Sequence, residues 1–568
     1  MGRWLFVSAC ALLTHAAALR AGFVWLDHAH IEEKLAIAPP SRWAGLFAEG
    51  FAGTGFYRPL MALSLSIDAL VGAPLAFHAV NLGWHAAASV MVVAAAEALG
   101  LSRRAATVAG VLFAVHPVAQ LPAHVIAFRS EAMIVVALLG LVAAHLRGKP
   151  LLAALALFLG ALSKEVALVL APAFIVALEW TCARGAARGA DAPGADARDA
   201  DARDADARGA ARDAARGADA RGADARDGAR ASRRRLWIAE ALAFAGALGL
   251  RLRFAPSWRA AHEPLAALDA LGTRFGALAK SAGAVFFPVD RHICDAFRIV
   301  PPWHPLSLLG LAVALAVVRW ALRRRGPALL LALSILPSLH LVPIMRWWSP
   351  HYAYLPLAFA SMLAAEAMER LDARQSARPN GVGRANAAAL GVGLLFAGIT
   401  LFDGSRFGSD TALWRAEVSA QPACREGHFY LGEVERQAQR FASAAKEYEA
   451  ALAPWPGVLA YVDRAAALQN LGTVFLELRR FTDAQRAFRA ALAGAKGERN
   501  LRELVHDLAA ATFGAGDAAE AARLLEPETA RPDAFPDSLT LRALALQKLG
   551  RHEEARSLLA RTGATKSP

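Results

Sequence analysis

Long apolar runs, separated by short polar stretches, dominate the chain up to about residue 405. A helix needs roughly 20 apolar residues to cross the ~30 Å hydrocarbon layer of a bilayer. About eleven runs approach that length, and each predicts a membrane-spanning helix. They lie at 4–26, 76–98, 104–118, 127–146, 149–163, 166–182, 236–252, 304–322, 327–345, 352–370 and 387–404. The pattern therefore predicts an all-α, polytopic membrane protein with one membrane half in 1–182 and the other in 233–405.

Composition supports this class. Hydrophobic residues make up 56% of the 568 positions, and the mean hydropathy is +0.33, which is too apolar for a soluble chain of this length. The net charge of +13 does not indicate nucleic acid, because much of it lies in short loops between the apolar runs. Cytoplasmic loops are rich in lysine and arginine. The basic loops are Arg103-Arg104, 147–149, 233–235 and 323–325. With the N-terminus inside, they all fall on the cytoplasmic side, and eleven spans place the C-terminus outside.

Two segments leave alternatives open. The apolar stretch 271–288 contains Arg274 and Lys280, so we interpret it as an interfacial or re-entrant helix on the outer side rather than a span. The first apolar run follows Arg3 and contains three consecutive alanines from Ala16, which is also a pattern of signal peptides. Both interpretations of the first run leave residue 27 and the loop 27–75 outside.

Residues 183–232 are a low-complexity segment of aspartate, alanine, arginine and glycine. The segment has almost no large apolar residues, so it lacks the means to bury a core and we expect it to be disordered or transiently helical. Its acidic and basic residues alternate closely, which argues against strong anion binding. It is predicted to be a cytoplasmic linker between the membrane halves.

A repeat appears in residues 406–568. A Leu-Gly pair at Leu431 and another at Leu471 are each followed by an Arg-Phe pair and then by an alanine. The equivalent alanines are Ala444, Ala484, Ala521 and Ala555, at spacings of 40, 37 and 34 residues. The last spacing and the signature resemble tetratricopeptide repeats, in which small residues let antiparallel helices approach closely. The region is predicted to be an α-solenoid that binds a protein partner, with a purely structural cap as the alternative.

Asp27 opens the first polar stretch of the chain, directly after the apolar run that ends at Leu26. An acid at the mouth of a membrane span is costly and is a candidate functional group. It is the candidate general base. Other polar residues fall at the same predicted outer ends of spans, and we take them as candidate substrate or phosphate contacts: Arg58, His116, Arg129, Lys164, Glu165, Arg346, His351 and Tyr352.

Each candidate has a plainer alternative. Arg129 could simply form an ion pair with Glu131 or Asp27. Lys164 and Glu165 could form a solvated turn between two spans. The aromatic-rich stretch around His351 could be an interfacial anchor. Helical spacing also places His78, Asn81 and His85 on one face of the second run, where they could be a buried polar cluster.

The four cysteines, Cys10, Cys182, Cys294 and Cys424, show no metal-ligand spacing. Cys294 and Cys424 both fall on the predicted outer side, where a disulfide could persist. Sequence does not establish whether they pair.

Together these motifs resemble a family of multi-spanning proteins with C-terminal tetratricopeptide repeats, whose animal members are lumenal O-mannosyltransferases. The matching pieces, in order, are Phe23 to Asp27, Tyr57 to Leu60, His78 to Asn81 with His85, Leu112 to Pro117, Leu162 to Glu165 and Tyr352 to Pro356. The resemblance covers most of the chain apart from 183–232.

The family implies a GT-C membrane fold and a transfer of sugar from a polyprenyl-phosphate donor to a protein or glycan acceptor on the non-cytoplasmic face. It places the chain in the inner membrane with the repeats on the periplasmic side. Asp27 matches the second acid of a pair that is common in this family, and Leu26 stands where the first is usual. His351 stands where an arginine is frequent. No cofactor follows from this comparison, and a divalent metal is left open.

The leading hypothesis is an inverting glycosyltransferase with Asp27 as its base. The first alternative is a non-catalytic membrane scaffold that binds proteins through its repeats, which the missing acid at position 26 keeps open. The second is a transporter of lipid-linked glycans, for which the chain shows few of the midspan charges and no clear internal symmetry.

Overall fold

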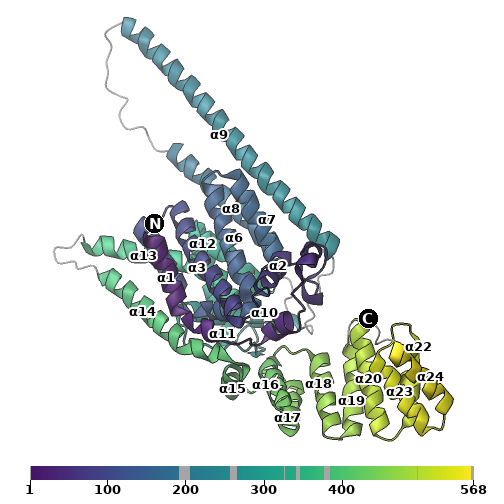
Figure 1. Cartoon of the computed structure of the whole chain (residues 1–568). Helices are drawn as coiled ribbons and strands as arrows, with labels where there is room; N and C mark the ends of the chain where they lie inside the picture. Colours follow the sequence, from purple (N-terminus) through teal and green to yellow (C-terminus); the bar gives the residue numbers. More distant parts are fainter. Residues whose placement is uncertain are drawn as a thin grey trace. The chain divides into compact units, whose positions relative to one another are not determined.

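The computed structural model describes residues 2–190, 205–255, 265–324, 326–340, 346–376, 384–495 and 497–564. These residues form two compact units. The membrane unit comprises 1–291 and 300–409, and the repeat unit comprises 292–299 and 410–568. The described part of the chain is predominantly helical and has two short strands (Figure 1). This confirms the predicted all-α class.

The α-helices of the membrane unit follow one another in this order: α1 (Gly2–Thr14), α2 (Pro59–Asp68), α3 (Pro74–Ala98), α4 (Arg103–Val115), α5 (Gln120–His124), α6 (Arg129–Leu146), α7 (Pro150–Ser163), α8 (Ala167–Ala190), α9 (Ala205–Phe254), α10 (Ala267–Phe286), α11 (Pro305–Arg324), α12 (Pro327–Ile335), α13 (Tyr354–Ser376) and α14 (Arg384–Gly404). Their core is built largely from alanine, valine and leucine, with α6 among the most deeply buried helices. Small side chains allow close packing of helices in membranes.

By length and composition, four helical stretches among the described residues can cross a membrane: Pro74–Ala98, Ile126–Leu146, Pro305–Arg323 and Ala387–Gly408. The pair Arg103–Val115 and Pro117–His124 passes the same test together but is bent by 55°. The break follows from Pro117, which has no N–H to continue the helix. Several of the other predicted spans are shorter apolar helices. The number eleven therefore stays a prediction.

The first predicted span, 4–26, is wrong as a continuous helix. Helix α1 ends at Thr14, and a 3-10 turn follows from Ala16 to Arg20. Residue Trp25 then has a φ of 58°, a left-handed conformation that a helix does not contain. The chain bends in this way because residues 21–27 pack inside the unit instead of continuing along the axis of α1.

The predicted linker 183–232 is helical where the structure describes it, since α8 continues to Ala190 and α9 begins at Ala205. Alanine and arginine are strong helix formers, which accounts for this local structure. Residues 191–204 lie outside the described residues. Most of the segment 271–288 lies in α10, which ends at Phe286, and its predicted place at the membrane interface stays a prediction.

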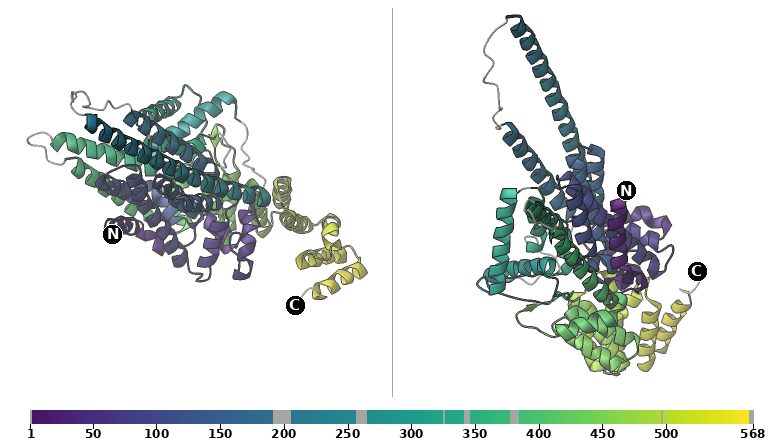
Figure 2. Two further views of the ribbon diagram at one scale, coloured as in Figure 1. Left: turned by 90° about the horizontal axis from the view of Figure 1, so that it is seen from above. Right: turned by 90° about the vertical axis from the view of Figure 1, so that its left-hand side faces the viewer.

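The repeat unit contains β1 (Phe297–Arg298) and, after residue 409, α15 (Asp410–Ala420), α16 (Arg425–Gln437), α17 (Phe441–Leu452), β2 (Val458–Leu459), α18 (Arg464–Glu477), α19 (Phe481–Gly494), α20 (Glu498–Gly514), α21 (Ala518–Leu524), α22 (Glu526–Ala530), α23 (Pro536–Lys548) and α24 (His552–Ala564). Neighbouring helices stack in chain order, as the green-to-yellow part of Figure 2 shows. This is the antiparallel helix-pair arrangement that the repeat predicts.

The repeat signature has a direct packing explanation. The four equivalent alanines, Ala444, Ala484, Ala521 and Ala555, are fully buried. An added Cβ at Gly432 would lie 2.7 Å from the ring of Tyr448, and one at Gly472 would lie 2.6 Å from the ring of Phe488. Each Leu-Gly pair therefore opens the first helix of a repeat so that an aromatic ring of the second helix can pack against its backbone.

We predict that Gly472→Ala destabilises the repeat unit by about 1–3 kcal/mol, because the new methyl group overpacks the buried ring of Phe488. Gly494→Ala is the matched control, since its Cβ would meet Ala465 at an ordinary 3.8 Å. Hydrogen exchange of peptides from α18 and α19, measured on the full chain in detergent, reports this local stability. Equal protection in both variants would contradict the packing explanation.

Candidate functional site

Asp27 lies in the interior of the membrane unit, with its side chain fully buried. One carboxylate oxygen accepts a hydrogen bond from the backbone N–H of Ala127 at 2.7 Å, and the other accepts one from Val24 at 3.5 Å. Burial raises the pKa of Asp27 from 3.8 to about 7, while these backbone donors act in the opposite direction. The carboxyl group is therefore poised to exchange a proton near neutral pH.

A second set of charged residues comes together from four parts of the sequence. We call it the Lys164 cluster, and its members are Arg58, Glu131, Lys164, Glu165 and His351. Glu131 forms an ion pair with Lys164, and its Oε1 lies 3.6 Å from Nε2 of His351. Glu165 accepts hydrogen bonds from Nε of Arg58 at 3.1 Å and from the backbone N–H of Tyr57 at 2.6 Å.

The positions of these residues on their helices explain why they meet. Arg58 precedes α2, whose first residue is Pro59, and Glu131 lies in the first turn of α6. Lys164 and Glu165 form the turn between α7 and α8. His351 lies in a short 3-10 turn that leads into α13. The cluster is thus assembled at helix ends, as the sequence pattern predicts for Arg58, Lys164, Glu165 and His351.

An aromatic layer connects Asp27 with the Lys164 cluster. The ring of Trp25, two residues before Asp27, lies 5.0 Å from the ring of Phe128, and Phe128 lies 4.7 Å from His351. The guanidinium of Arg346 lies 5.3 Å above the ring of Trp25. Asp27 and the cluster therefore belong to one continuous part of the membrane unit.

The electrostatics of the cluster follow from burial and from mutual repulsion. Burial lowers the pKa of His351 well below 6.5, and the neighbouring charges of Lys164, Arg346 and Arg58 lower it further. Burial also lowers the pKa of Lys164, against the attraction of Glu131. Three basic side chains, Arg58, Lys164 and Arg346, thus lie near the two carboxylates Glu131 and Glu165. Basic side chains gathered in one region can bind an anionic ligand when it displaces their carboxylate partners.

Arg129 has other partners. It is fully buried, and its three nitrogens donate to Asn81 at 2.8 Å, Ser64 at 2.8 Å and the carbonyl oxygen of Phe77 at 2.9 Å. It also pairs with Asp68 at 2.5 Å. Arg129 therefore links α2, α3 and α6, and neither of the predicted pairs with Glu131 and Asp27 is its ion pair in the structure. We leave it out of the proposed phosphate contacts.

Two further candidates also make internal contacts. His116 caps the turn after α4, where Nδ1 accepts the N–H of Val118 at 3.1 Å and Nε2 lies 2.9 Å from the carbonyl oxygen of Val285. The hydroxyl of Tyr352 donates to the carbonyl oxygen of Arg346 at 3.1 Å. Both residues hold neighbouring chain segments in place around the candidate site.

The predicted polar face of α3 is buried. His78 contacts the carbonyl oxygen of Gly22 at 3.1 Å, Asn81 binds Arg129, and Nδ1 of His85 lies 2.8 Å from the hydroxyl of Tyr354. These residues therefore form the buried polar cluster that the sequence analysis gave as their alternative role.

Sequence reasoning did not select Glu131 or Asp68 as site residues. Glu131 is the shared partner of Lys164 and His351, and its position two residues after Arg129 in the first helical turn was the available signal. Asp68 lies at the end of α2, a helix that the sequence analysis did not predict within the loop 27–75. The short apolar run Pro59–Asp68, which ends in this acid, was the signal that could have found it.

Within the described residues, no group of three or more His, Cys, Asp or Glu side chains is arranged to hold a metal ion. The chemistry considered below uses side chains alone.

The Arg129 contacts generate a stability prediction. Asp68→Ala leaves a buried guanidinium without its counter-ion, and we expect a loss of about 3–5 kcal/mol. Asp372→Ala is the control, because its partner Arg104, at 2.7 Å, is 53% exposed and can be solvated, so about 0–1 kcal/mol is expected. Unfolding of both variants in mixed micelles with increasing dodecyl sulfate measures the difference. Equal losses would show that Asp68 does not support a buried charge.

No family model matches the chain. Several curated relatives match over part of it, including the following three. Protein O-mannosyl-transferase Tmtc2 of Drosophila melanogaster is 35% identical over 125 residues, 20% of this chain and 13% of that protein. Protein O-mannosyl-transferase Tmtc1 of the same organism is 36% identical over 120 residues, 19% of this chain and 14% of that protein. Protein O-mannosyl-transferase tmtc2 of Xenopus laevis is 32% identical over 124 residues, 20% of this chain and 15% of that protein.

Among solved structures, the crystal structure of MamA aligns with 29% of this chain and 88% of its own, with 17% identity and a TM-score of 0.24. That similarity is too low to support a statement about the fold. The alignments with the curated relatives span only 13–15% of those proteins' lengths. Over about a fifth of its length, the chain is similar to the Tmtc protein O-mannosyl-transferases, and this confirms the family resemblance that its motifs indicate.

Proposed function

We propose that the protein is a membrane glycosyltransferase that transfers a sugar from a polyprenyl-phosphate donor to a protein acceptor on the non-cytoplasmic face. The observation that carries the proposal is a buried aspartate with a pKa of about 7, joined through an aromatic layer to a cluster of basic side chains at helix ends. The names of the similar proteins support the reaction class.

Asp27 acts as the general base. An acceptor hydroxyl attacks the anomeric carbon and loses its proton to the Asp27 carboxylate as the new bond forms. A pKa of about 7 suits this step, because a base is most effective when its pKa lies near the working pH. One base and direct displacement of the lipid phosphate invert the configuration at the sugar, as in inverting hydrolases.

The leaving group is a lipid phosphate, and cations stabilise the charge that develops on it. Arg58, Lys164 and Arg346 supply that charge. In the structure Arg58 and Lys164 are paired with Glu165 and Glu131. An incoming phosphate therefore replaces these carboxylates as the partner of some of the N–H groups. Arginine is well suited to the exchange, since its planar fork binds phosphate oxygens in pairs.

The remaining parts of the chain supply the two substrates. The apolar helices hold the polyprenyl tail in the membrane, and the helical repeats bind or present the protein acceptor, as solenoid repeats do through extended surfaces. We place the protein in the cell's inner membrane with its repeats on the periplasmic side, from the distribution of basic loops.

A non-catalytic scaffold is the second candidate. It is favoured by the complete burial of Asp27, whose backbone hydrogen bonds also suit a purely structural role, and by Leu26 at the position of the usual first acid. In this case the repeats are the working part of the protein.

The first test is sugar transfer from labelled polyprenyl-phosphate sugars in membranes that contain the wild type or Asp27→Asn. We expect Asn at position 27 to lower the transfer rate by about 10²–10⁴-fold, because it retains the shape and loses the base. Glu32→Gln is the control, since Glu32 lies in the same loop with 53% of its side chain exposed. Undiminished transfer by Asp27→Asn would refute the base assignment, and no transfer by correctly inserted wild type with any donor would favour the scaffold.

The second test is pH dependence. The pKa of Asp27 is raised in the folded state, so the ionised base accumulates as pH rises through about 7, and kcat/KM is expected to rise over that range. Stability changes in the opposite direction. Protonated Asp27 contributes fully to the free energy of unfolding below about pH 4, the pKa of an aspartate in the unfolded chain. This contribution is lost as pH rises through about 7, the pKa in the folded protein. Thermal unfolding of wild type and Asp27→Asn between pH 4 and 8 checks this sign, and identical profiles would contradict it.

A further inference from the structure

Residues 292–299 lie between α10 and α11 in the sequence, yet they belong to the repeat unit. Strand β1 pairs antiparallel with β2, with Phe297 opposite Leu459 and Arg298 opposite Val458. The N–H of Ile299 continues the ladder by donating to the carbonyl oxygen of Gly457 at 2.8 Å. We call residues 292–299 the anchor segment.

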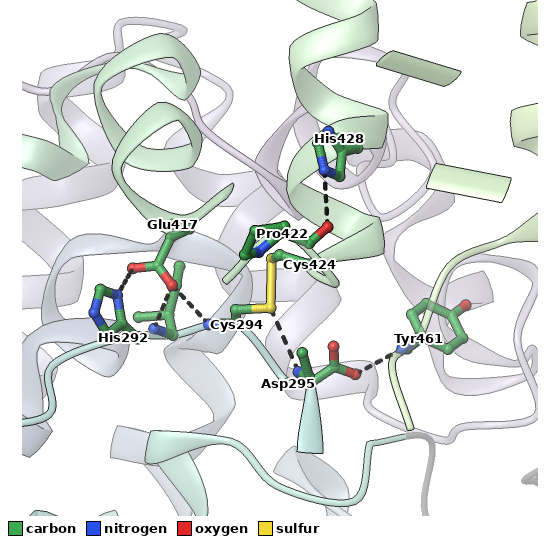
Figure 3. Close-up of a disulfide and its surroundings, with 10 residues drawn as sticks. His292, Cys294, Asp295, Glu417, Pro422, Cys424, His428 and Tyr461 are labelled. Atoms are coloured by element: carbon green, nitrogen blue, oxygen red, sulfur yellow. Dashed lines mark hydrogen bonds and ion pairs between the residues drawn. A yellow bond between two sulfur atoms is a disulfide. The ribbon is translucent and has the colours of Figure 1, made fainter. Parts of the chain in front are cut away.

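A buried acid holds the start of the anchor segment. Glu417, on α15, is fully buried, and its Oε2 accepts the backbone N–H groups of Ile293 and Cys294, each at 3.0 Å. Its other oxygen lies 3.4 Å from Nδ1 of His292. Figure 3 shows these contacts, together with the carboxylate of Asp295, which accepts the N–H of Tyr461 at 3.0 Å. A buried carboxylate with several donors is a stable arrangement, because each charge-assisted hydrogen bond offsets desolvation.

A disulfide between Cys294 and Cys424 closes this arrangement (Figure 3). The two Cα atoms are 5.8 Å apart and 130 residues separate them in sequence. Both cysteines are buried, at 2% and 0% exposure, and Cys424 immediately precedes α16. The sulfur atoms are thus shielded from small thiols in solution, which protects the bond once it has formed.

We propose that the surface formed by α15, the start of α16 and β2 is a docking site for the anchor segment, and that a disulfide-donating oxidant seals it on the non-cytoplasmic side. The step is a thiol–disulfide exchange. Cys294 and Cys424 lose two protons and two electrons as their S–S bond forms, and the donor disulfide is reduced to two thiols. Such bonds persist in oxidising compartments and are rare in the cytosol, so the anchor segment and the repeats share the oxidising side.

The non-covalent contacts determine which cysteines pair. Glu417 fixes the backbone at Cys294 itself, and the β1–β2 pairing fixes the segment three residues later. These contacts bring the two sulfur atoms together before oxidation and raise their effective concentration. Cys10 and Cys182 lie in the membrane unit and are free thiols, so the pairing is selective.

The anchor gives the repeat unit a second attachment. The chain passes between the two units after residue 291, before residue 300 and after residue 409. The disulfide joins the first two passages to the third covalently, so that the repeats are tied to the loop between α10 and α11 as well as to the end of α14. This inference is independent of the proposed sugar transfer.

The test counts thiols in the full chain with Cys10→Ser and Cys182→Ser, which leaves only Cys294 and Cys424. Intact cells are quenched with acid, and the denatured protein is treated with a polyethylene-glycol maleimide before or after reduction. We expect no adduct without reductant and two adducts after reduction. Two adducts without reductant would overturn the proposal, as would a bond that appears only after the cells are lysed. Sugar transfer is not part of this measurement, so its outcome does not depend on the proposed function.

Two variants sharpen the result. Cys294→Ser is expected to show one adduct without reductant, because Cys424 then lacks its partner. Glu417→Ala is expected to lower the oxidised fraction, whereas Glu477→Ala, at an exposed position in the same unit, is expected to leave it unchanged. Full oxidation of Glu417→Ala would refute the role of Glu417 in aligning the sulfur atoms. Proteolysis of the wild type, monitored at residues 286–304, tests the anchor without any substitution. Mild reductant is expected to increase cleavage there, because it breaks the disulfide that holds the anchor segment.

Discussion

The buried guanidinium of Arg129 is the interaction on which the membrane unit's site depends. A charge inside a low-dielectric interior is tolerated only when it is paired and fully hydrogen-bonded. Arg129 meets this requirement by drawing partners from α2 and α3 to the first residue of α6. The start of α6 and the residues just before it also contribute other parts of the site. Ala127 binds Asp27, Phe128 forms the aromatic layer, and Glu131 joins Lys164 to His351. A shift of this helix end would therefore disturb Asp27, the aromatic layer and the contacts of Glu131 with Lys164 and His351.

The same principle explains why acids and bases in the site have divided roles. Glu131 and Glu165 each form an ion pair with a cation, Lys164 and Arg58 respectively. Asp27 accepts backbone hydrogen bonds from Ala127 and Val24, and its complete burial raises its pKa to about 7. Two environments a short distance apart thus provide one carboxyl group that can change protonation state near neutral pH and others that serve as counter-ions. Such a separation of roles is a general feature of acid–base sites.

Local pattern was sufficient for much of the architecture. The spacing of Ala444, Ala484, Ala521 and Ala555 predicted the stacked helix pairs, and these alanines are fully buried. The polar stretch at Lys164 predicted a turn between two apolar helices, which α7 and α8 confirm. The first apolar run misled because apolar composition is required both for crossing a membrane and for packing inside a helical unit. Residues 21–26 pack inside the helical unit. Only the packing and the left-handed backbone at Trp25 distinguish this from a membrane-crossing helix.

The sequence by itself determined the helical class, the repeats and the residues most worth examining, because apolar periodicity and repeat signatures act over short stretches of chain. The tertiary structure decided which of these residues meet. Arg58 and Glu165 are 107 residues apart, His85 and Tyr354 are 269 apart, and Cys294 and Cys424 are 130 apart. Several partners were available to each of these groups in the sequence. Only the packed helices bring each of these buried groups within bonding distance of a particular partner, and a buried polar group left unpaired costs more than its hydrogen bond contributes.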